Sequence, residues 1–161
     1  MGGDISTDNS PVQRPGRSIE SLSADERHFL TMVRQFMDGI ARPNDLGWIT
    51  ALIHAEQHLA DRQGARLAYG VLAAVQALRG ARPVDFRYHR ASCLTCSQVL
   101  TPDEQLFVAA FRGAQKGDDR GLSHHLCLLT FGPDHRQLAC TLRQLALDFH
   151  FSGQVATRTP L

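Results

Sequence analysis

Apolar residues recur every three or four positions along most of this chain, which is the spacing of one face of an α-helix. Six segments show this pattern and are expected to be helices: residues 23–40, 44–61, 63–80, 101–117, 119–131 and 134–149. In the second segment, the spacing places Trp48, Leu52, Ala55 and Leu59 on the buried face. The pattern therefore predicts an all-α fold, a bundle of about six helices.

The same spacing nominates core residues in the other helices, because only one side of each helix can face its neighbours. These expected core residues are Phe29, Val33, Phe36, Ile40, Leu67, Val71, Ala74, Leu78, Leu106, Phe107, Ala110, Phe111, Ala114, Leu138, Leu142, Leu145 and Phe149. Ser23 and Glu26 stand three positions apart at the start of the first helix, where they match a capping box.

One stretch between the third and fourth predicted helices breaks the helical period. In residues 83–90, Val84, Phe86 and Tyr88 alternate with polar side chains, which is the period of a β-strand. We expect a short strand or an extended connector here. Residues 147–151 show a similar alternation, so the two segments could pair as a small β-ribbon.

Two of the predicted helices resemble each other. Residues 22–39 align without gaps on residues 100–117, and Leu, Asp, Glu, Phe, Arg and Gly are shared between them. Each segment is followed by two more predicted helices, so one interpretation is a duplicated three-helix unit with halves at residues 21–80 and 98–150. Convergence is the alternative, because any two capped amphipathic helices share much of this pattern.

The predicted helices fit a single domain at residues 21–153, since a chain of 161 residues has room for one ordinary core. Residues 1–20 are rich in Gly, Ser, Asp, Asn and Pro and show no periodicity, so we expect a disordered tail there. Residues 154–161 have a similar composition and are expected to form a flexible C-terminal tail.

Composition narrows the classes of function and location. The formal net charge is +1, so bulk charge favours neither nucleic acid nor an anionic membrane as a partner. No stretch resembles a signal peptide, and no apolar run is long enough to span a bilayer. We therefore expect a soluble cytoplasmic protein without a membrane partner, in which the four cysteines are thiols or metal ligands.

A cluster of cysteine and histidine in and after the connector is the first candidate site. Cys93 and Cys96 are two residues apart along a C-x-x-C sequence, and His89 precedes them. Zn²⁺ takes four nitrogen or sulfur ligands, and His124 and Cys127, on one face of the fifth predicted helix, could complete the set. The alternatives for the two cysteines are a redox-sensitive thiol pair and small packed thiols.

A second candidate site lies on the second predicted helix. His54, His58 and Asp61 follow one another at helical spacing, so they share a narrow stripe that could hold a transition metal. The stripe lies away from the expected buried face. Solvent-exposed histidines are therefore the favoured interpretation, with a metal site as the alternative.

The connector also carries four arginines with aromatic residues between them, which is a pattern that can hold phosphates and stack on bases. They are Arg79, Arg82, Arg87 and Arg90. The favoured interpretation is a connector whose arginines pair with carboxylates of the helices, because the overall charge is close to neutral.

These features favour a non-enzymatic regulatory or adaptor protein that acts through protein–protein contacts, including self-association. A Cys/His zinc site or a redox-sensing site would then control the contact. The alternatives are a metal-dependent enzyme in a helical bundle and a nucleic-acid-binding regulator that uses the arginine-rich connector.

Overall fold

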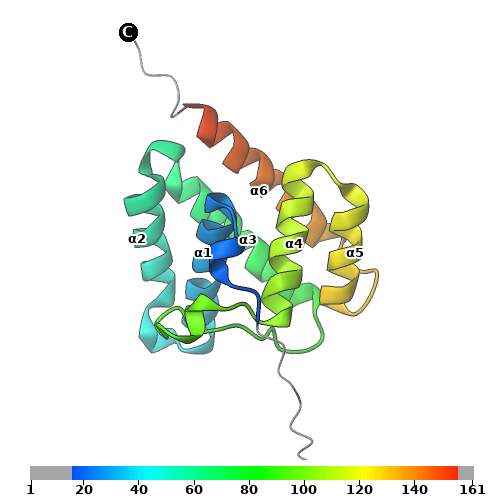
Figure 1. The fold of residues 1–161 in the computed structure, drawn as a ribbon, viewed down its shortest axis with the longest axis horizontal. Coiled ribbons are helices and arrows are strands. Elements are labelled where there is room, and N and C mark those ends of the chain that lie inside the picture. The colour runs from blue at the N-terminus through cyan, green and yellow to red at the C-terminus, as the bar shows by residue number, and fades with distance from the viewer. Residues whose placement is uncertain (1–15, 156–161) are drawn as a thin grey trace, which may run out of the picture.

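Six α-helices make up most of residues 16–155, which are the residues that the computed structural model describes (Figure 1). They are α1 (Ala24–Ala41), α2 (Gly47–Leu59), α3 (Gly64–Ala81), α4 (Pro102–Lys116), α5 (Asp119–Thr130) and α6 (Arg136–Val155). Short 3-10 turns are also present: Ile19–Ser21, Pro43–Asp45, Ala60–Arg62 and Cys96–Gln98. The predicted all-α bundle is confirmed.

The predicted β-ribbon is wrong. Residues 147–151 lie inside α6, so their backbone groups bond within the helix and cannot pair with the connector. The alternation of apolar and polar residues there reflects one buried position, Phe149, between exposed neighbours. In the described part of the chain, the strand-like pairing that does occur is one isolated antiparallel bridge between Ser18 and Val99.

Residues 16–20, which were predicted to belong to the N-terminal tail, contact the connector instead. The Leu100 N–H donates to the Arg17 carbonyl at 2.9 Å, and the bridge at Ser18 continues this contact, so residues 16–20 are ordered against the connector. At the other end, α6 extends to Val155. The rest of both predicted tails lies outside the described residues.

Aromatic rings from three helices form the centre of the core. Phe29 of α1 stacks on Phe111 of α4, with ring centroids 4.3 Å apart, and meets Phe107 edge-on at 5.0 Å. Phe149 of α6 contacts Phe111 at 5.4 Å. The residues expected in the core of α1, α3, α4 and α6 are buried or, at Ile40, Leu106 and Ala114, partly buried against it.

One buried and one partly buried ion pair join α1 to α4. Arg34 of α1 donates to both carboxylate oxygens of Glu104, at 2.7 and 3.0 Å, and Arg112 of α4 donates to both oxygens of Glu26. Burial raises the pKa of Glu26, but the hydrogen bonds from Arg112 and from the Ser23 backbone N–H lower it by more. The ungapped alignment places Glu26 on Glu104 and Arg34 on Arg112, so equivalent residues of the two similar helices bond each other reciprocally.

α2 buries two of the four residues predicted for its core face, Ala55 and Leu59, and exposes the other two. Its buried residues are mostly small: Gly47, Ala51, Ala55 and Leu59. Trp48 and Leu52, which were expected inside, are 50% and 43% exposed. The cause is a close approach to α1, because a Cβ on Gly47 would lie 2.3 Å from the Gln35 carbonyl oxygen. Only small residues fit such a contact, so size decides the orientation of α2 rather than hydrophobicity alone.

The buried pair at Glu104 predicts a large effect of removing one charge. Glu104→Gln leaves the guanidinium of Arg34 buried without its carboxylate, and we expect the free energy of unfolding to fall by about 3–5 kcal/mol. The exposed pair between Arg143 and Asp119 provides the control. Asp119→Asn should cost less than about 1 kcal/mol. Urea denaturation of both variants measures the difference. Equal losses of unfolding free energy would contradict the expectation that breaking the buried pair is more costly than breaking the exposed one.

Candidate functional site

The connector, residues 82–101, runs from α3 to α4 without regular structure apart from its one 3-10 turn (Figure 1). It passes along the ends of α1 and α4 and reaches the start of α2. Backbone N–H and C=O groups in such a partly buried segment need hydrogen-bond partners. Charged side chains of α1 and α4 supply many of them.

On α1, Asp38 and Arg34 hold the connector before and after residues 92–96, respectively. The guanidinium of Arg34 donates to the carbonyl oxygens of Ser97 at 2.8 Å and Val99 at 2.9 Å. The carboxylate of Asp38 accepts the Ala91 N–H at 3.1 Å and the Tyr88 hydroxyl at 3.2 Å. Burial and the nearby Asp38 raise the pKa of Tyr88, which keeps this hydroxyl a donor. Two residues one helical turn apart thus fix both sides of residues 92–96.

On α4, Asp103 and Glu104 hold the first half of the connector. Asp103 accepts hydrogen bonds from the Arg82 guanidinium at 2.7 Å and from the Arg87 N–H at 2.8 Å. Glu104, which already pairs with Arg34, also accepts the His89 N–H at 3.1 Å. The first turn of α4 is therefore both a helix cap and an anchor for the connector.

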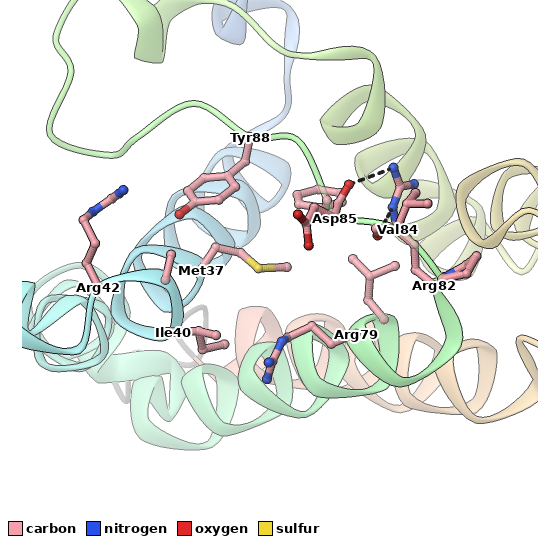
Figure 2. Close-up of a pocket in the computed structure, with 12 residues that line it drawn as sticks. Met37, Ile40, Arg42, Arg79, Arg82, Val84, Asp85 and Tyr88 are labelled. Carbon is pink, nitrogen blue, oxygen red and sulfur yellow. Dashed lines mark hydrogen bonds between the residues drawn. The ribbon is translucent and has the colours of Figure 1, made fainter.

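A cavity of about 580 Å³ lies between the connector and the C-terminal ends of α1 and α3 (Figure 2). Met37 and Ile40 of α1 line it together with Tyr88 and Asp85 of the connector. Arg79 of α3 stands at its edge. The connector therefore covers a partly apolar hollow at this end of the bundle.

Cys93 and Cys96 lie in contact within the connector, and both side chains are partly exposed. The Cys96 backbone N–H donates to the sulfur of Cys93 at 3.3 Å. The hydrogen bond with the Cys96 thiol lowers the pKa of Cys93, and the same bond raises the pKa of Cys96. The two thiols are therefore adjacent but not equivalent, and Cys93 is the one that loses its proton more readily.

The other predicted zinc ligands do not join this pair. His124 and Cys127 are exposed on α5, which packs on α4, whereas Ser92 lies beside the start of α2. His89 is anchored through its backbone to α4. Within residues 16–155, no three His, Cys, Asp or Glu side chains are grouped so that they could hold a metal. The predicted five-residue zinc site is therefore not assembled in this structure.

The predicted histidine stripe on α2 gains a partner from α1 that the sequence did not indicate. The Nδ1 atom of His28 lies 3.1 Å from the Nε2 atom of His54, and the rings of His54 and His58 have centroids 4.7 Å apart. His54 is half-buried rather than solvent-exposed, while His58 and Asp61 are exposed. Burial, together with the neighbouring His28 and His58, lowers the pKa of His54 to about 4.

The four arginines of the connector have separate roles. Arg82 is buried and donates to the carbonyl oxygens of Val84 at 3.0 Å and Leu129 at 2.6 Å, besides its bond to Asp103. Arg90 pairs with Asp45 at 3.0 Å. Arg79 bonds Gln76, and Arg87 is exposed. The interpretation that connector arginines pair with carboxylates is therefore correct for Arg82 and Arg90, and Arg82 is too buried to contact a nucleic acid.

The outward side of α2 is the largest departure from the predicted pattern. Four large apolar residues there are 43–50% exposed: Leu46, Trp48, Leu52 and Ile53. We call this set the α2 face. It covers the first half of α2 and the residue before it, next to the point that the connector reaches.

Comparisons with known proteins found no family model, no curated protein and no solved structure that matches this chain. In the part of the chain that the structure describes, no helix has both the length and the apolar character needed to cross a membrane.

The histidine cluster predicts a loss of stability in mild acid. The folded-state pKa of His54 is about 4, below its ordinary value of 6.5, so the folded protein binds fewer protons than the unfolded chain as the pH falls. The stability that the neutral His54 contributes to the fold is fully present above pH 6.5 and is lost as the pH falls toward 4. Burial and His58 lower the pKa of His28 too; Asp25 opposes this, whereas Arg62 and Arg27 reinforce it.

His54 is partly exposed to solvent, so we expect a loss on the order of 1 kcal/mol in unfolding free energy between about pH 7.5 and pH 5. His54→Gln should reduce this pH dependence, since glutamine does not titrate in this range. His124→Gln, at an exposed position on α5, is the matched control. Urea denaturation at both pH values makes the measurement, and an unchanged pH dependence in His54→Gln would contradict the assignment.

Proposed function

We propose that this protein is a regulatory or adaptor module that acts through protein–protein contacts, and that the α2 face is its contact surface. The observation that carries this proposal is the exposure of large apolar residues on α2. A helix on the surface of a soluble bundle normally places its large apolar residues inward and its small or polar residues outward. α2 buries Gly, Ala and one Leu, and leaves its Trp, its other Leu and one Ile exposed.

α5 in the other half of the chain provides an internal comparison, because it also packs on the outside of the central helices. It buries Leu122, Leu126 and Leu129 and exposes Leu128 and, at the residue after its end, Phe131. α5 therefore follows the ordinary rule with similar surroundings and a similar length. The exposed apolar residues of α2 are accordingly a property of that helix and not of the bundle.

The occupant that we assign to the α2 face is a second copy of this chain. Large apolar residues at about half exposure offer roughly 400 Å² of contact area when four of them lie together. A standard interface buries about 800 Å² on each partner, of which slightly more than half is apolar. The α2 face thus supplies about the apolar share that one side of a stable dimer needs.

The distribution of charge on α2 also suits self-association. In an antiparallel, two-fold packing centred on Ile53, residues three positions before and three positions after the centre face each other. Glu56 of one copy then lies opposite Thr50 of the other, so the only carboxylate of α2 meets a hydroxyl and not a second carboxylate.

Self-association predicts a concentration-dependent dimer whose formation Trp48 reports. This residue is the only Trp of the chain, and covering its indole should shift its fluorescence to shorter wavelength as the dimer forms. Leu52→Glu should weaken the dimer by about tenfold or more, because it places an unpaired charge in the apolar contact. Light scattering after size exclusion and Trp fluorescence measure mass and burial over the same range of concentrations.

The matched control is Leu128→Glu on α5, where the wild-type leucine is 49% exposed. It adds the same charge at a similarly exposed position and should leave the dimer intact. Both variants should retain the unfolding free energy of the isolated protomer. A monomeric wild-type protein at every concentration would overturn the proposal, as would equal effects of the two substitutions.

A further inference from the structure

The loop at residues 92–96 is held firmly at its two sides but is open to solvent between them. Asp38 accepts the Ala91 N–H on one side, and Arg34 donates to the Ser97 carbonyl on the other. Within the loop, the Ser97 N–H donates to the Cys93 carbonyl at 2.9 Å, which closes a single turn. Leu94, at the tip between the two cysteines, is 84% exposed.

This geometry keeps two thiols together where small molecules can reach them. The side chains of Cys93 and Cys96 share a hydrogen bond, and the backbone N–H of Cys96 also points to the sulfur of Cys93. A sulfur that accepts two hydrogen bonds is stabilised as a thiolate, and the positive charge of Arg90 acts in the same direction. Cys93 is therefore suited to be the attacking sulfur and Cys96 to be the resolving one.

We propose that Cys93 and Cys96 form a thiol–disulfide exchange site, which converts between a dithiol and an intramolecular disulfide by reaction with a disulfide oxidant such as oxidised glutathione. This goes beyond the proposed contact function and does not depend on the α2 face. The two neighbouring sulfurs provide the two reacting groups that the exchange requires, and their anchored flanks keep the groups together.

The reaction is balanced in two steps. The Cys93 thiolate attacks one sulfur of oxidised glutathione, the glutathione S–S bond breaks, and the departing glutathione thiolate takes up the proton that Cys93 had released. Cys96 then loses its proton and attacks the Cys93 sulfur of the mixed disulfide, releasing the second glutathione, which takes that proton. Two electrons pass from the protein dithiol to the oxidant, and two reduced glutathione molecules leave.

The same contacts favour exchange over zinc as the chemistry of this pair. A structural zinc site needs four ligands, and two thiolates provide half of them. As described above, the histidines and Cys127 do not join the pair to complete a set. Exchange needs nothing beyond the two sulfurs and an oxidant that reaches them from solvent.

The test uses the full chain incubated in glutathione buffers of graded ratio, quenched by alkylation and mapped by mass spectrometry. We expect a Cys93–Cys96 disulfide to form. In Cys96→Ser, a stable mixed disulfide with glutathione should accumulate on Cys93, because the resolving thiol is gone. In Cys93→Ser, the remaining Cys96 should react with oxidised glutathione about tenfold or more slowly than Cys93 does in the wild-type protein.

Cys127 and Cys140 are exposed thiols on α5 and α6 and serve as internal controls. Iodoacetamide near neutral pH should modify Cys93 about tenfold faster than either of them. Equal rates, or glutathione added separately to Cys93 and Cys96 without a disulfide between them, would overturn the proposal. One equivalent of Zn²⁺ that is retained after gel filtration and lost in Cys93→Ser would also overturn it.

Repeating the exchange in Leu52→Glu separates this proposal from the proposed function. A disulfide that forms at the wild-type rate in that variant supports an exchange site that is independent of self-association. Loss of exchange in Leu52→Glu would contradict this independence, even if the wild-type protein forms the disulfide.

Discussion

The reciprocal ion pairs between α1 and α4 are the constraint on which the rest of the structure depends. Each of the four charges is largely removed from water, and an uncompensated charge in such a place is far more costly than the pair itself. α1 and α4 must therefore lie antiparallel in one register, since a shift by one helical turn would separate Glu26 from Arg112 and Arg34 from Glu104 together. That register also brings Phe29 against Phe107 and Phe111 and so positions the centre of the core.

Two of the same charged side chains, Arg34 and Glu104, also hold the connector by hydrogen bonds. Arg34 uses the donors that Glu104 does not occupy to hold two connector carbonyls, and Glu104 accepts a connector N–H in addition to its guanidinium partner. A core interaction between two helices thus sets the path of a surface segment. For this reason the cysteine loop has a defined geometry although it contains little regular structure, and the chemistry assigned to it follows from contacts made deep in the bundle.

The sequence predicted the features that depend on local pattern and missed those that depend on distance between helices. Helical spacing and capping residues identified the six helices and most of the core, because each acts within a few residues. The prediction that Trp48 and Leu52 are buried was wrong because the close contact at Gly47 depends on a neighbouring helix. His28 was missed because it meets His54 from another helix, and the burial of Arg82 could not be foreseen because one of its acceptors, the Leu129 carbonyl, lies far along the chain.

The hypothesis of an internal duplication connects these observations. If two equivalent units once faced each other across a two-fold axis, equivalent residues near that axis would bond reciprocally, as Glu26 and Arg112 do with Arg34 and Glu104. Features that serve only to hold the halves together would then be repeated in both, whereas features acquired later would appear in one half. The exposed face of α2 has no counterpart on α5, and the connector belongs to neither half. The two places assigned a function are thus among those that depart from the internal symmetry, which is where divergence for function would be expected after duplication.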